Sequence, residues 1–117
     1  MRTEAEEQEA VMRWAEMSLG VHPELALLFH IPNGGSRNKV EAAHLKRLGV
    51  KKGVPDLFLP VARNGYHGLF IEMKRERGSY ASEEQMIWMT NLRLEGYMAM
   101  VCRGYEHARN VIEEYLK

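Results

Sequence analysis

The dipeptide Asn64-Gly65 stands between two short apolar runs and constrains the fold of this chain more than any other feature. Asparagine and glycine tolerate the positive φ angles that a two-residue hairpin turn requires. We therefore expect strands over Pro55–Val61 and Gly68–Met73, joined by a loop over Ala62–His67. If the strands pair antiparallel, residues whose numbers sum to about 128 or 129 face one another.

This register brings charged side chains together at the open end of the hairpin. Asp56 falls opposite Glu72 or Met73, while Glu72 and Lys74 lie two residues apart and so on the same face of their strand. Two facing carboxylates repel each other, which is unfavourable without a cation. A divalent ion such as Mg²⁺ resolves this, because one or two carboxylates hold it while water and phosphate complete its shell. Such an ion and a nearby lysine stabilise the charge that develops during hydrolysis of a phosphate ester.

A simpler interpretation of the same residues needs no metal. An aspartate before a strand and a Glu-x-Lys sequence at a strand end are common on protein surfaces. Lys74 could then pair with Glu72 in solvent. The spacing by itself leaves both interpretations open.

Hydrophobic periodicity and turn residues predict the remaining elements. We expect one strand before the hairpin and one after it, over Leu25–Ile31 and Tyr97–Cys102. We also expect four helices, over Thr3–Leu19, Arg37–Leu48, Ser82–Glu95 and Tyr105–Leu116. The order α-β-α-β-β-α-β-α predicts an α/β fold in which a mixed β-sheet is flanked by α-helices. A chain of 117 residues has the size of one domain, so we expect a single domain over residues 1–117.

The predicted helix over Ser82–Glu95 begins with a capping-box pattern, Ser82 followed by Gln85. In that pattern Gln85 satisfies a backbone donor at the helix start. We expect Met86, Met89 and Leu92 or Arg93 on the inner side of this helix. In the helix over Arg37–Leu48 the apolar residues that recur at helical spacing are Val40, Ala43, Leu45 and Leu48.

The formal net charge is zero, which argues against a protein that coats nucleic acid through bulk electrostatics. Residues 36–52, however, carry six basic side chains against one glutamate, a local excess of five. Arg37, Lys51 and Lys52 are our candidates for phosphate contacts, and the loop at Asn33 could bring backbone donors to a phosphate. A solvated helix face explains the other basic residues equally well, and an ordinary strand-to-helix turn explains Asn33 and the glycines after it.

Several classes of protein and site are disfavoured by the sequence. No apolar run approaches the length of about 20 residues that spans a bilayer, and the acidic N-terminus does not read as a secretory signal. A lone cysteine, Cys102, excludes an internal disulfide, and the five histidines show no metal-ligand spacing. His30 is expected to be a core residue of its strand. A cytoplasmic protein is therefore the expectation.

Three features follow one another along the chain: Gly53–Asp56, then a hairpin, then Ile71–Lys74. Their order resembles that of the PD-(D/E)XK nuclease superfamily. More narrowly, the chain resembles the VRR-NUC branch of that superfamily. The motifs of the narrower resemblance span nearly the whole chain: Glu4 and Gln8, His30–Gly35, Leu48–Asp56, Ser82-x-x-Gln85 and Gly96-Tyr97. The name-giving Val-Arg-Arg signature is not evident, but Val50-Lys51-Lys52 occupies its neighbourhood and keeps the basic character.

The resemblance implies a restriction-endonuclease-like fold and a metal-dependent active site. It implies that Mg²⁺ or Mn²⁺ is bound by Asp56, Glu72 and the backbone carbonyl of Met73, and that Lys74 orients or activates the attacking water. Glu4 would be a further acidic residue; Glu7 competes, but Glu4 and Gln8 share one helical face. Gln85 would face the active site, a role compatible with its capping role.

The resemblance also implies a substrate and an assembly. Stand-alone members of this branch resemble Holliday-junction resolvases and occur in phages. It therefore implies an endodeoxyribonuclease that cuts four-way junctions or other branched DNA as a homodimer, in the cytoplasm of a bacterial or phage-infected cell. The alternatives are a non-specific nickase or restriction-like nuclease, and a catalytically silent DNA-binding module with the same fold.

Overall fold

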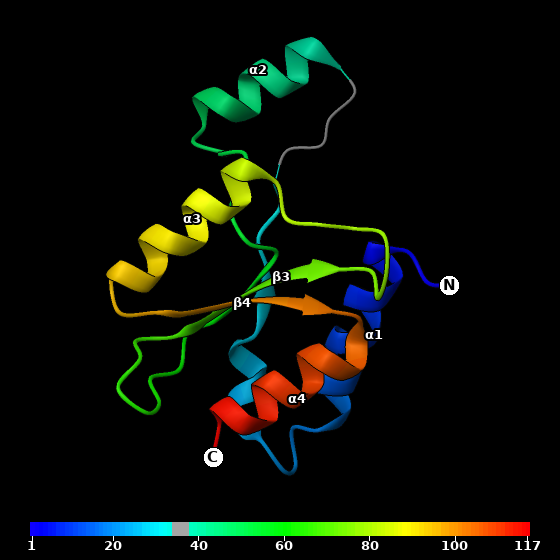
Figure 1. The fold of residues 1–117 in the computed structure, drawn as a ribbon, viewed down its shortest axis with the longest axis vertical. Coiled ribbons are helices and arrows are strands. Elements are labelled where there is room, and N and C mark those ends of the chain that lie inside the picture. Colours follow the sequence, from blue (N-terminus) through cyan, green and yellow to red (C-terminus); the bar gives the residue numbers. More distant parts are fainter. Residues whose placement is uncertain (34–37) are drawn as a thin grey trace.

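A four-stranded mixed sheet forms the centre of the protein in a computed structural model, which describes residues 1–33 and 38–117 (Figure 1). The strands are β1 (Phe29–His30), β2 (Leu57–Leu59), β3 (Leu69–Lys74) and β4 (Met98–Arg103). They lie in the order β1-β2-β3-β4; the first two pairs are antiparallel and β3 with β4 is parallel. The helices are α1 (Glu4–Met17), α2 (Lys39–Arg47), α3 (Glu83–Leu94) and α4 (Tyr105–Tyr115). The predicted α/β class and element order are confirmed.

The hairpin that joins β2 to β3 has the predicted turn and register. Leu57 faces Ile71 and Leu59 faces Leu69, so the paired residue numbers sum to 128. Asn64 and Gly65 have φ angles of 52° and 85°, as a type I′ turn requires. Strand β2 is shorter than predicted, three residues instead of seven. A proline lies on either side of it, and a proline has no N–H to donate to the hydrogen bonds between strands.

The predicted strand over Leu25–Ile31 is wrong in its first half. A 3₁₀ helix, η1 (Pro23–Leu27), precedes the two residues of β1. Pro23 occupies the first helical turn, where its fixed φ is favourable and its missing N–H needs no partner. A short apolar run fits a buried helical turn as well as a strand, which is why periodicity misassigned it.

The main core lies between the sheet and the pair α1–α4. Val11 and Trp14 from α1 and Ile112 from α4 pack there against Leu69, Ile71 and other residues of one sheet face. Because side chains alternate along a strand, Glu72 and Lys74 lie on the opposite face of β3. Helix α3 contacts β4 and buries Met89, but Met86 is 40% exposed, contrary to its predicted inner position.

Helix α2 projects from the rest of the protein, as Figure 1 shows at the top of the view. It contains no buried residue, and the apolar Val40 is 77% exposed. The helical spacing predicted for this segment is confirmed, but none of the apolar residues of α2 is fully buried. The segment after α2 is anchored to α3, because Trp88 Nε1 donates to the carbonyl of Lys52 at 3.2 Å.

No helix in the two described segments is long and apolar enough to cross a bilayer.

Gly53 fixes the approach of the chain to Asp56, and replacing it with alanine is expected to destabilise the protein by about 1–3 kcal/mol. Its φ is +95°, and an added Cβ would lie 2.9 Å from backbone atoms of Glu84. Denaturant unfolding measures the loss. Gly49→Ala is the matched control: its φ is +105°, but no atom lies within 4 Å of the added Cβ. Equal losses in both variants would contradict a role for the contact with Glu84.

Candidate active site

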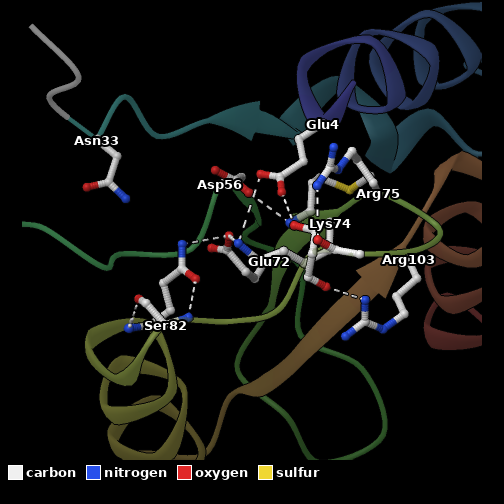
Figure 2. Close-up of polar contacts among 12 residues, drawn as sticks. Glu4, Asn33, Asp56, Glu72, Lys74, Arg75, Ser82 and Arg103 are labelled. Atoms are coloured by element: carbon white, nitrogen blue, oxygen red, sulfur yellow. Dashed lines mark hydrogen bonds and ion pairs between the residues drawn. The ribbon is translucent and has the colours of Figure 1, made fainter. Parts of the chain in front are cut away.

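Asp56 lies immediately before β2 and is held by both neighbouring strands. Its Oδ2 atom accepts a hydrogen bond of 2.7 Å from the backbone N–H of Met73. Its backbone carbonyl accepts from the N–H of Ile31 at 2.8 Å and from Nδ1 of His30 at 2.8 Å. Continuing the hairpin register by one residue places Asp56 opposite Glu72, as predicted. Figure 2 shows these two carboxylates beside Lys74.

Glu72 is a buried carboxylate whose two oxygens have different surroundings. Oε2 accepts a 2.9 Å hydrogen bond from Nε2 of Gln85 and lies 3.4 Å from Nζ of Lys74. Oε1 is buried without a hydrogen-bond partner among the described residues. Burial and then the Asp56 carboxylate raise the pKa of Glu72 to about 8, although Lys74 opposes the shift. The site therefore contains a carboxylate that lacks full compensation.

Gln85 has both of the roles that the sequence left open. Its side-chain oxygen accepts from the backbone N–H of Ser82 at 2.8 Å, which completes the capping box of α3. Its Nε2 group donates to Glu72 at the same time. The start of α3 is thus connected directly to the buried carboxylate.

The structure brings Glu4, and not Glu7, to Lys74. Glu4 Oε1 lies 3.9 Å from Nζ of Lys74, and its other oxygen accepts a hydrogen bond from the hydroxyl of Ser79. Glu7 is buried elsewhere and accepts from the backbone N–H of Tyr105 at 3.0 Å. A carboxylate there is favourable because it faces the N-terminus of α4.

A cavity of about 460 Å³ opens beside Asp56, lined by Glu4, Gln8, His30 and Met73 among others. His30 was expected in the core, but it is exposed and faces this cavity. A carbonyl can only accept, so Nδ1 of His30 donates its N–H to the backbone carbonyl of Asp56. The sequence could not identify this position, because β1 has only two residues and shows no alternation.

The donor set fits a hard divalent cation that keeps several waters. Across residues 1–33 and 38–117, no group of three or more His, Cys, Asp or Glu side chains is placed to hold a metal by itself. Mg²⁺, however, is commonly bound through one or two carboxylates and water. Asp56 and Glu72, whose Oε1 has no partner among the described residues, supply two carboxylates, and Met73 lines the cavity beside Asp56.

The predicted phosphate-contacting residues lie apart from these carboxylates. Asn33, Lys51 and Lys52 line one groove of about 620 Å³ beneath α2. Asn33 Nδ2 donates to the carbonyl of Val54 at 2.9 Å, while its Oδ1 is buried without a partner among the described residues. Both lysines are exposed, and Lys52 pairs with Glu84 at 3.7 Å. The fourth prediction, Arg37, lies outside the described residues.

A four-stranded mixed sheet flanked by helices, with Asp56, Glu72 and Lys74 at the open end of its hairpin, is the arrangement of a restriction-endonuclease-like nuclease fold. The sequence matches the family described as VRR-NUC domain over residues 2–106. A solved structure described as a VRR_NUC domain protein is 38% identical and superposes with a TM-score of 0.84, covering 98% of this chain and 88% of that chain. No curated protein gives a significant match. The chain belongs to the VRR-NUC family, which implies a nuclease-type function with DNA as substrate.

Proposed function

We propose that this protein is a Mg²⁺- or Mn²⁺-dependent endodeoxyribonuclease. The observation that carries the proposal is the buried Oε1 of Glu72, which has no partner among the described residues and belongs to a carboxylate facing Asp56. Asp56, Glu72 and the backbone carbonyl of Met73 would hold the ion. Once bound there, the ion supplies Lewis-acid polarisation of the scissile phosphate and of the attacking water.

We propose that Lys74 acts on the phosphate itself. Its side chain is nearly buried, and its ammonium lies between the carboxylates of Glu4 and Glu72. An ammonium has three N–H donors, so two carboxylate partners leave one donor for a phosphate oxygen or the attacking water. Glu4 and Gln85 position Lys74 and Glu72, respectively, and need not touch the substrate.

We further propose that the substrate is branched DNA, such as a four-way junction, and that two copies of the chain act together. Two features of α2 and of the residues just after it support this. The exposed apolar side chains Val40 and Leu48 would be covered by a second copy. The groove beneath α2 exposes Lys51 and Lys52 to a DNA backbone. Two active sites related by a two-fold axis suit symmetrical cleavage of a junction.

The test uses labelled four-way junction, flap, plain duplex and supercoiled plasmid, each with Mg²⁺, Mn²⁺ or EDTA. We expect divalent-dependent cutting that is strongest on the junction and is lost in Asp56→Ala. Light scattering after gel filtration measures the oligomeric state in parallel. Equal cutting of all substrates would favour a non-specific nickase or restriction-like enzyme. Binding without any cutting would favour a silent DNA-binding module.

Replacing both Lys51 and Lys52 with alanine is expected to weaken DNA binding about equally on all sequences. The plot of log K against log salt has a negative slope. Each phosphate contact that is lost makes this slope less steep by about 0.9 for duplex DNA. Fluorescence anisotropy at several salt concentrations, with EDTA present, measures this slope. Lys117→Ala removes another exposed lysine, just beyond the end of α4, and serves as the control. An unchanged slope in the double variant would remove the groove from the proposed DNA path.

A further inference from the structure

The segment from Arg75 to Ala81 connects β3 to α3. At both of its ends it is joined along the chain to elements that carry residues of the site. It follows Lys74 directly and leads into the helix whose Gln85 donates to Glu72. Near its middle, the hydroxyl of Ser79 donates to the carboxylate of Glu4, which is itself paired with Lys74. This segment, which we call the β3–α3 loop, therefore forms one wall of the site.

Arginine side chains hold the β3–α3 loop in place. Arg75 Nη2 donates to the carbonyl of Gly78 at 3.0 Å. Arg103, at the end of β4, donates through Nη1 to the carbonyl of Ser79. Figure 2 shows both arginines on one side of the Asp56–Glu72 pair and Asn33 on the other side. The loop thus lies across the site from the groove that contains Lys51 and Lys52.

Tyr80 is the exposed aromatic residue of this loop. Its side chain is 76% exposed although it stands next to the buried Ser79. The guanidinium carbon of Arg103 lies 5.0 Å from the centroid of its ring, a cation–π arrangement that orients the ring. Because the residue is so exposed, the ring face away from Arg103 is open to solvent. A ring supported on one face and open on the other is a platform for a second flat group.

The surroundings of Tyr80 favour a nucleobase over an apolar protein surface. Its neighbours along the chain are small or polar: Gly78, Ser79, Ala81 and Ser82. They form no apolar patch of the kind that marks a protein interface. Among the loop and the charged side chains that contact it, Arg75, Arg77 and Arg103 stand against Glu76 and Glu4, an excess of one positive charge that favours a phosphate backbone. Aromatic stacking combined with nearby arginines is how proteins hold single-stranded nucleic acid.

We infer that the β3–α3 loop binds an unpaired nucleotide of the substrate, with its base stacked on Tyr80 and its phosphate near Arg75, Arg77 and Arg103. This inference rests on the proposed function and adds to it a feature of DNA structure that the site reads. Bases inside a duplex are stacked on their neighbours and present no free face. Tyr80 therefore favours a strand end, flap or open branch point next to the scissile phosphate over plain duplex.

The test is binding of the full chain to a single-stranded oligonucleotide that contains 2-aminopurine, with EDTA present so that nothing is cut. We expect Tyr80→Ala to weaken single-strand binding by roughly 5- to 150-fold, which corresponds to the loss of one stacked base. Its affinity for a blunt duplex should change by less than about twofold. Tyr80→Phe should keep both the affinity and the quenching of 2-aminopurine fluorescence. Leu94→Ala removes a side chain that is equally exposed, 77%, at the other end of α3.

Three outcomes would overturn the inference. They are wild-type single-strand binding by Tyr80→Ala, an equal loss on single strands and duplex, and a loss in Tyr80→Phe as large as that in Tyr80→Ala. Thermal unfolding of each variant checks the fold, which an exposed residue should not affect. Because binding is measured without divalent cations, a protein that never cuts DNA but loses single-strand binding in Tyr80→Ala would reject the proposed nuclease activity and retain this inference.

Discussion

Glu72→Gln will abolish cleavage and, without divalent cations, will make the protein more stable than the wild type at alkaline pH. The folded protein holds Glu72 with a pKa of about 8, against an ordinary value of 4.5. Between these pH values the folded state retains a proton that the unfolded chain has released. The free energy of unfolding must therefore fall as pH rises through this window, by at most about 1.4 kcal/mol per pH unit. Glutamine keeps the shape of the side chain and removes this dependence.

Denaturant unfolding at pH 5, 7 and 9 in EDTA measures the effect. Mn²⁺ added at pH 8 should stabilise the wild type, because it binds the folded state, and should leave Glu72→Gln nearly unchanged. Glu84→Gln is the matched control, since it makes the same chemical change in a side chain that is 51% exposed. Stability of the wild type that rises from pH 5 to pH 8 would contradict the role given to Glu72, as would a Glu72→Gln protein that is less stable at pH 9.

Lys74→Met should lower the cleavage rate by about 10²–10³-fold while DNA binding changes only a few-fold. Methionine fills the nearly buried position but removes the ammonium that lies between Glu4 and Glu72. The expected loss is that of one preorganised group that stabilises developing charge in the transition state. Single-turnover cleavage, with DNA affinity measured separately in EDTA, tells the two quantities apart.

Lys52→Met is the control for Lys74→Met, because it removes a lysine that is 83% exposed and pairs with a glutamate. We expect it to weaken binding slightly and to leave single-turnover cleavage near the wild-type rate. If Lys74→Met instead lost binding and cleavage in parallel, Lys74 would be a substrate contact and not part of the reaction.

The sequence predicts well those features that depend on neighbouring residues. The Asn64-Gly65 turn and two-residue alternation are local, and together they fixed the register that sets Asp56 opposite Glu72. The capping box at Ser82 and Gln85 is local too, and it positions the amide that reaches Glu72.

Features that depend on distant parts of the chain could not be predicted in the same way. Which glutamate of α1 pairs with Lys74 depends on where α4 begins. The Glu7 carboxylate accepts a hydrogen bond from the N–H of Tyr105, which is 98 residues away in the sequence. Ser79 contacts Glu4 across 75 residues and carries no signal in its surroundings. The exposure of Met86 and of α2 likewise follows from how elements meet, which helical periodicity does not encode.

Because none of its residues is buried, α2 contributes little to the packing of this protein. A helix of nine residues is marginal by itself in water, so the fold gains little from α2 and loses little when its residues change. Substitutions there can alter what the protein contacts while the sheet and its carboxylates keep their geometry. Over evolution, this is the part of the chain in which a new substrate preference or a new partner can arise with the least risk to the nuclease fold.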